Sequence, residues 1–208
     1  MKATLDGQDL ALDRPSLAAA LEAGASHARD HGRIVIEVLV DGQTLEGEAL
    51  DHASDEPLPS GHIEMTTADP ASLVRVTLFD AADAMEVSKD EHASCAEMIH
   101  RGDVSEAMGA LAQVLATWQA VREAIIQGGA AVGQPLNEFA GEGALDERTE
   151  TLSRQLDALK RAVADEDLVT VADLLEDDLY AEAGLWADTL RVIAEAMKEH
   201  PETPNTNA

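Results

Sequence analysis

The stretch that most constrains the fold is residues 103–128, DVSEAMGALAQVLATWQAVREAIIQG, which shows the clearest amphipathic periodicity in the sequence. Asp103 is placed to cap the start of a helix, and Gly128–Gly129 predicts its end. Because a helix with a broad apolar face cannot bury that face alone, we expect other helices to cover it. The apolar positions recur at spacings of three and four, apart from Arg122 near the end: Val104, Met108, Leu111, Leu115, Trp118 and Ile125, widened by Ala107, Val114 and Val121.

The composition narrows the classes of partner. The formal net charge is -27 over 208 residues, and the carboxylates are spread over the whole chain. Such a charge opposes binding to DNA, RNA and anionic lipid. A solubilising surface, a basic protein partner and adaptation to high salt each account for it. Aromatic residues make up only 2% of the chain, so we expect an aliphatic core and no deep aromatic-lined ligand pocket.

The sequence also bears on the compartment. Cys95 is the single cysteine, so no disulfide can form within the chain. The first residues, MKATLDGQDLALD, lack the apolar core of a signal peptide. No apolar run reaches the length needed to cross a bilayer. We therefore expect a cytoplasmic protein that does not bind membranes.

The N-terminal third alternates strand and turn signals. Two Asp-Gly pairs, Asp6–Gly7 and Asp41–Gly42, predict tight hairpins. Ser16 predicts a helix start, and Gly32 predicts its end. In the best strand, Ile34, Ile36, Val38 and Val40 are expected on one aliphatic face. The expected strands are residues 2–5, 8–12, 33–42, 43–46 and 62–67, with a loop over 47–61.

The order strand, strand, helix, strand, strand, strand resembles the β-grasp arrangement familiar from ubiquitin-like domains. The resemblance covers residues 1–68 and rests on the element order and the two Asp-Gly turns. No sequence motif of a named β-grasp family is present. The segment is not followed by a diglycine terminus, since the chain runs on into helices, so a conjugation role is not expected.

The rest of the chain predicts helices. Asp69–Pro70 opens a helix to about His100, whose seam contains Val74, Leu78, Ala81, Met85, Ser88, His92, Cys95 and Ile99. Residues 128–144 are rich in glycine and form the main linker. Helices follow over about 145–164 and, capped by Asp165, about 166–198, and residues 200–208 are expected to be disordered. We predict an α+β protein with a β-grasp-like domain over 1–68 and a bundle of about four helices over 69–199, in which two helical hairpins look alike.

Ser88, His92 and Cys95 form the most suggestive set for catalysis, because spacings of four and three place them on one helix face. A nucleophile also needs an orienting group and an oxyanion site, which neighbouring turns of one helix rarely supply. The favoured interpretation is a polar segment of a helix seam, with Cys95 as a small apolar residue. We therefore predict no catalytic residues.

Three other patterns resemble ligand-binding sites but lack part of what such a site needs. His27 and His31 have the i, i+4 spacing that can place two imidazoles on one metal, but no third ligand lies at motif spacing. Residues 128–133 match the glycines of a phosphate loop, yet the lysine and the hydroxyl residue are missing. An acidic helix surface without the spacing of an EF-hand is the third pattern; it contains Asp173, Glu176, Asp177, Asp178 and Glu182.

The sequence thus favours a non-enzymatic, acidic protein-interaction module, an adaptor or a chaperone-like factor, with no cofactor and no metal. Its partner is expected to be a protein, either a basic one or a second copy of the chain. The first alternative is a metal-binding protein or an enzyme that uses His92 and Cys95, or His27 and His31. The second is a nucleic-acid mimic. The predicted partner-binding residues are Asp173, Asp177, Asp178, Glu182 and Trp186.

Overall fold

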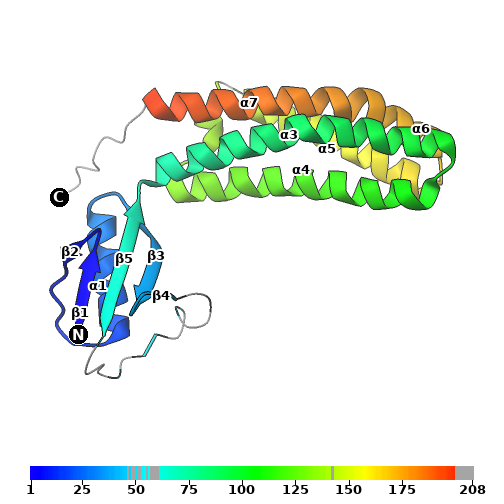
Figure 1. Cartoon of the computed structure of the whole chain (residues 1–208). Helices are drawn as coiled ribbons and strands as arrows, with labels where there is room; N and C mark the ends of the chain where they lie inside the picture. The colour runs from blue at the N-terminus through cyan, green and yellow to red at the C-terminus, as the bar shows by residue number, and fades with distance from the viewer. Residues whose placement is uncertain are drawn as a thin grey trace. The chain divides into compact units, whose positions relative to one another are not determined.

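The computed structural model describes residues 1–45, 47, 50, 53, 54, 56, 61–141 and 143–199, and the structural statements below concern these residues. The protein is α+β and 70% helical, with a small mixed sheet. It divides into two compact units, of which the first is Met1–Leu73 and the second begins at Val74 (Figure 1).

The first unit contains the sheet, which has the strand order β2-β1-β5-β3-β4. β1 and β5 are parallel, whereas the other neighbours are antiparallel. Both predicted Asp-Gly hairpins are present, and their four central residues have positive φ angles, as tight two-residue hairpins require. The second and fourth strands are shorter than expected. The strands are β1 (Lys2–Leu5), β2 (Gln8–Asp9), β3 (Ile34–Val40), β4 (Gln43–Thr44) and β5 (His62–Ala68).

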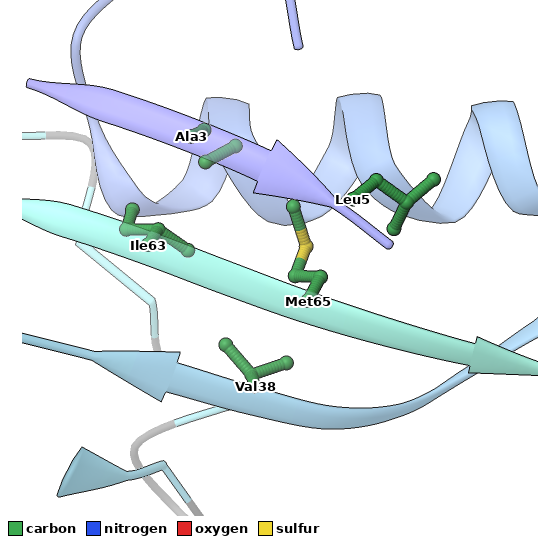
Figure 2. Packing of buried hydrophobic residues seen from close by; sticks show 6 residues of the cluster. Ala3, Leu5, Val38, Ile63 and Met65 are labelled. Carbon is green, nitrogen blue, oxygen red and sulfur yellow. The ribbon is translucent and has the colours of Figure 1, made fainter. Parts of the chain in front are cut away.

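Helix α1 (Leu17–Asp30) packs on one face of this sheet. The side chain of Ser16 caps it by accepting a hydrogen bond from the Ala19 amide at 3.2 Å. Gly24 lets the helix approach the strands, since a Cβ there would lie 2.5 Å from Sδ of Met65. Figure 2 shows the core between helix and sheet, which is formed by Ala3, Leu5, Ala20, Val38, Ile63 and Met65.

The face of β3 differs from the sequence prediction. A β-bulge between Val35 and Glu37 interrupts the register with β5, so the alternation of inward and outward side chains shifts by one residue. Val35, Val38 and Val40 therefore pack on the core. The exposed fractions of Ile34 and Ile36 are 39% and 50%. The alternation of residue types along the sequence does not reveal the extra residue of this bulge.

The second unit consists of helices that run lengthwise beside one another (Figure 1). Asp69 caps the first of them, because its carboxylate accepts hydrogen bonds from the amides of Ala71 and Ser72 at 3.3 and 3.0 Å. The elements are α3 (Pro70–Arg101), α4 (Val104–Val132), the 3-10 helix η1 (Leu136–Glu138), α5 (Ala144–Ala164), α6 (Leu168–Asp173), the π-helix η2 (Leu174–Leu179) and α7 (Tyr180–Glu199).

The helix contacts centre on two tryptophans. Trp118 of α4 and Trp186 of α7 meet edge to face, with ring centroids 6.2 Å apart, and each is 3% exposed. The predicted burial of Trp118 is confirmed. α3 contacts α7 through Arg75, whose Nε donates to the Ala194 carbonyl at 3.0 Å. The buried residues of α3, α4 and α7 therefore share one core.

α4 continues beyond the predicted stop at Gly128–Gly129. Gly128 is buried, and a Cβ there would lie 3.0 Å from Cγ1 of Val74 and 3.1 Å from Cδ1 of Leu136. This glycine therefore serves close packing rather than termination. The helix ends at Gly133, whose φ of 73° is the left-handed conformation of a helix C-cap.

The last predicted helix also begins later than expected. Glu166 has a φ of 55°, which excludes it from a right-handed helix, and the start moves to Leu168. Asp167 is the cap in place of Asp165, since its carboxylate accepts from the Thr170 amide at 3.2 Å. The predicted disordered tail, residues 200–208, lies outside the described residues. Every described helix is too short or too polar to cross a membrane.

Candidate functional site

The candidate site is a group of exposed carboxylates where α6 passes into η2. We call Asp173, Glu176, Asp177 and Asp178 the acidic segment; all four side chains are exposed. Asp173 is the last residue of α6, and the other three are consecutive in η2. The sequence prediction included three of these residues as partner-binding positions.

The π-helix presents these carboxylates on a backbone anchored in the core. Leu175 and Leu179 are fully buried, one on each side of the three consecutive acidic residues. A π-helix replaces the usual i→i+4 hydrogen bonds with i→i+5 bonds, and such segments occur frequently at functional sites. Glu176, Asp177 and Asp178 thus project from an element whose position is set by packed leucines.

His100 contacts the acidic segment, and Lys89 contacts Tyr180, the residue that follows η2. Nε2 of His100, at the end of α3, lies 3.4 Å from Oε2 of Glu176. Nζ of Lys89 lies 5.1 Å from the ring centroid of Tyr180 and 3.3 Å from Oε2 of Glu86. The ammonium group of Lys89 therefore makes both a cation-π contact and an ion pair. Asp173, Asp177 and Asp178 make no ion pair that includes another described residue.

The other two predicted partner-binding residues lie in the core. Glu182 is 3% exposed, and both its carboxylate oxygens lie 3.4 Å from Nη1 of Arg148 on α5. This pairing compensates a buried charge. Trp186 is equally buried, and its indole Nε1 has no hydrogen-bond partner among the described residues. Of the five predicted partner-binding residues, Asp173, Asp177 and Asp178 are therefore exposed on neighbouring elements. Glu182 and Trp186 are buried and are not accessible to a partner.

Ser88, His92 and Cys95 are all fully buried in the seam of α3. The indole Nε1 of Trp118 donates to Nε2 of His92 at 3.1 Å, and Nδ1–H of His92 donates to the Ser88 carbonyl. The Ser88 hydroxyl donates to the Met85 carbonyl at 2.8 Å. Burial lowers the pKa of His92 and raises that of the Cys95 thiol. These groups are thus engaged in packing and in local hydrogen bonds.

His27 and His31 stack on the exposed side of α1, with ring centroids 4.4 Å apart. Nδ1 of His31 bonds to the His27 carbonyl at 2.7 Å. Among the described residues, no group of three or more His, Cys, Asp or Glu side chains is arranged to hold a metal ion. The pair therefore offers at most two ligands from described side chains.

The sequence reasoning did not identify the ion-pair network around Arg191. This guanidinium lies 3.1 Å from Asp83, 3.4 Å from Glu86 and 3.7 Å from Asp188. The pKa of Arg191 is raised, mainly by its side-chain hydrogen bond with Asp83. The pair of Asp188 and Arg191 could be predicted from their i, i+3 spacing within α7. The pairs with Asp83 and Glu86 could not, because α3 is distant from α7 in the sequence.

Several other carboxylates serve turns and helix caps rather than the acidic segment. Side-chain hydrogen bonds from Thr67, Ser72 and Thr170 are the main causes that lower the pKa of Asp6, Asp69 and Asp167, respectively. The Asp6 carboxylate also accepts a hydrogen bond from the Thr67 amide at 2.8 Å. The acidity of the chain is therefore divided between structural carboxylates and exposed ones.

Comparison with known proteins finds no matching family model, no matching curated protein and no matching solved structure.

Proposed function

We propose that this protein is a cytoplasmic, non-enzymatic interaction module that presents the acidic segment to a basic protein partner, as an adaptor or a chaperone-like factor does. In this proposal residues 1–68 form a β-grasp-like domain and residues 69–199 form a four-helix bundle. The strand order β2-β1-β5-β3-β4, with β1 parallel to β5 and α1 on one face, supports the first assignment. The lengthwise contacts of α3, α4, α5 and α7 support the second.

The observation that carries the proposal is the exposure of Asp173, Asp177 and Asp178 on a backbone anchored by Leu175 and Leu179. Because the backbone is anchored in the core, binding has to order only the side chains of these carboxylates. Exposed charges at an interface mainly raise the association rate and select partners of opposite charge. The net charge of -27 favours the approach of a basic protein and opposes that of nucleic acid.

The engagement of His92 and Cys95 also supports a non-enzymatic role. A general base needs a nitrogen that is free to take a proton from a reacting group. Both ring nitrogens of His92 are used by Trp118 and Ser88. A nucleophilic cysteine is usually exposed and has a lowered pKa, whereas Cys95 is buried and its pKa is raised.

The proposal is tested by capture of the tagged full chain from cells that naturally produce it, at low and at moderate salt. We expect a basic protein to be retained in a fixed ratio at low salt and released as the salt concentration rises. Metal analysis of the same purified protein tests the alternative, a metal-binding protein or a metal-dependent enzyme. A transition metal bound in a fixed ratio, and lost in His27→Ala/His31→Ala or in His92→Ala, would replace this proposal with a metal-dependent one.

A further inference from the structure

A pocket in the second unit lies where the end of α4, η1 and the start of α5 come together. The structure describes every residue that lines it, all of them between Ile125 and Thr149. Its volume is about 630 Å³, and pockets for small molecules in proteins measure about 300–1,000 Å³. The pocket is therefore large enough for a small molecule, and none of its lining residues belongs to the acidic segment.

A glycine at the end of α4 shapes one wall of this pocket. A Cβ at Gly129 would lie 3.2 Å from the Gln134 carbonyl oxygen, so the absence of a side chain lets residues 134–136 turn back against the helix. Ile126 of α4 and Leu145 of α5 contribute apolar side chains. None of the lining residues, all of them described, is aromatic. The walls of the pocket are therefore mainly aliphatic.

Two side-chain acceptors at the pocket have no partner among the described residues. Oδ1 of Asn137 in η1 is buried without a hydrogen bond, and an acceptor in this state destabilises the fold. Asp146 is exposed and makes no ion pair with a described residue, because the nearest basic residue along the chain, Arg148, pairs with Glu182. A hydrogen-bond donor in the pocket would satisfy the first acceptor, and a positive charge would pair with the second.

The surroundings of the pocket favour a positive charge. None of the lining residues, each of which is described, is Lys, Arg or His. The last turn of α4 likewise has no basic residue, although the C-terminal end of a helix attracts cations. The N-terminal end of α5 would oppose a cation, but Asp146 and Glu147 in its first turn offset this effect. A cation is therefore the ligand charge that fits this pocket.

We propose that the pocket between α4, η1 and α5 binds a small organic cation with an apolar body, in the simplest case an alkylammonium ion. Its ammonium group donates a hydrogen bond to Oδ1 of Asn137 and pairs with the carboxylate of Asp146. Its apolar body lies against Ile126 and Leu145. The volume limits the size of the ligand, the aliphatic walls select the body, and the two acceptors select the charge. This site lies outside the acidic segment and does not depend on the interaction role.

The probes share one apolar body and differ in the head group. Hexylammonium, hexanol and hexanoate are each added to the full chain at moderate salt concentration, which screens the general attraction of cations to a chain of net charge -27. Two-dimensional NMR follows the backbone amide signals. Hexylammonium should shift the signals of residues 125–149 up to saturation. Hexanol should bind about tenfold more weakly, and hexanoate should cause no such shift.

Three substitutions locate the head group. Asn137→Ala removes the buried acceptor and should weaken hexylammonium binding about tenfold. Asp146→Asn removes one exposed ion pair and should weaken it about threefold. Glu147→Gln is the matched control, because it removes the same charge from the same turn of α5 at a position that does not line the pocket. This control should leave binding unchanged, and circular dichroism confirms that all three variants are folded.

A further probe distinguishes a free cation from a side chain of a partner protein. Lysine blocked at both ends presents an ammonium group on a shorter apolar stem, so it should bind more weakly than hexylammonium. Tighter binding of the blocked lysine would identify a protein side chain as the occupant and overturn the proposal. Equal shifts with all three hexyl probes, no saturable shift within residues 125–149, or equal affinities of the Asp146→Asn and Glu147→Gln variants for hexylammonium would each overturn it as well.

Discussion

The indole Nε1 of Trp118 donates a hydrogen bond to Nε2 of His92 across 3.1 Å. An indole N–H can only donate, so Nε2 of this imidazole must be the acceptor and Nδ1 must carry the proton. Nδ1–H is directed at the Ser88 carbonyl, which can only accept. The fold therefore holds His92 neutral, and protonation of Nε2 would break the bond from Trp118.

This arrangement predicts a pH-dependent stability. Burial lowers the pKa of His92 in the folded state below its usual 6.5, so the unfolded chain binds the proton more readily. The contribution of His92 is therefore complete above about pH 6.5 and decreases as the pH falls toward the folded-state pKa. Urea unfolding between pH 8 and pH 5 measures the slope. His92→Gln should reduce that slope, and an unchanged slope would show that other groups cause it.

The two tryptophans should respond differently to loss of the indole nitrogen. Trp118→Phe leaves Nε2 of His92 without its donor, so the free energy of unfolding should fall by about 1–3 kcal/mol beyond the cost of the smaller ring. Trp186→Phe is the matched control, since its Nε1 has no partner among the described residues. Denaturant titration of both variants gives the comparison. Equal losses would argue against a special role for the Trp118–His92 bond.

Two helical glycines should show opposite effects when changed to alanine. A Cβ at Gly24 would meet Sδ of Met65 at 2.5 Å in a closed core, so Gly24→Ala should lower stability by about 1–3 kcal/mol. A Cβ at Gly109 would meet nothing within 4 Å, so Gly109→Ala should raise stability by about 0.5–1 kcal/mol through helix propensity. Thermal unfolding measures both. A stabilising Gly24→Ala would mean that Met65 adapts freely.

Salt should stabilise the protein. With a formal charge of -27, repulsion between carboxylates opposes the compact state, and dissolved ions screen it. The melting temperature should therefore rise as sodium chloride increases from low to moderate concentration. Sucrose at equal osmolality is the control for non-ionic effects. A flat or falling curve would show that local pairs, such as those of Arg191, already compensate the excess charge.

The sequence predicted the elements better than their details. The two Asp-Gly hairpins, the caps at Ser16 and Asp69, and the burial of Trp118 followed from local chemistry and periodicity. The bulge at Ile36 did not, because one extra residue in a strand leaves the composition of the segment unchanged. Gly128 was misread as a stop because its close neighbours, Val74 and Leu136, are distant in the sequence.

The candidate site was less predictable than the fold. The exposure of Asp173, Asp177 and Asp178 followed from a helix with acidic residues opposite its apolar stripe. The inward position of Glu182 depends on Arg148, on a different helix, which no pattern within α7 could indicate. The π-helix over Leu174–Leu179 was likewise not predicted, because its apolar and acidic residues fit the period of an ordinary α-helix.

The most direct test of the interaction role neutralises the acidic segment. The full-length variant Asp173→Asn/Asp177→Asn/Asp178→Asn removes three charges from side chains that make no ion pair with a described residue. The control variant Asp80→Asn/Asp90→Asn/Glu106→Gln removes three charges from other exposed positions on α3 and α4. Both are compared with the unchanged chain for binding of the captured basic partner by titration calorimetry. The account predicts that the first variant binds at least about tenfold more weakly and that the control is nearly unaffected; equal affinities of the two variants would contradict it.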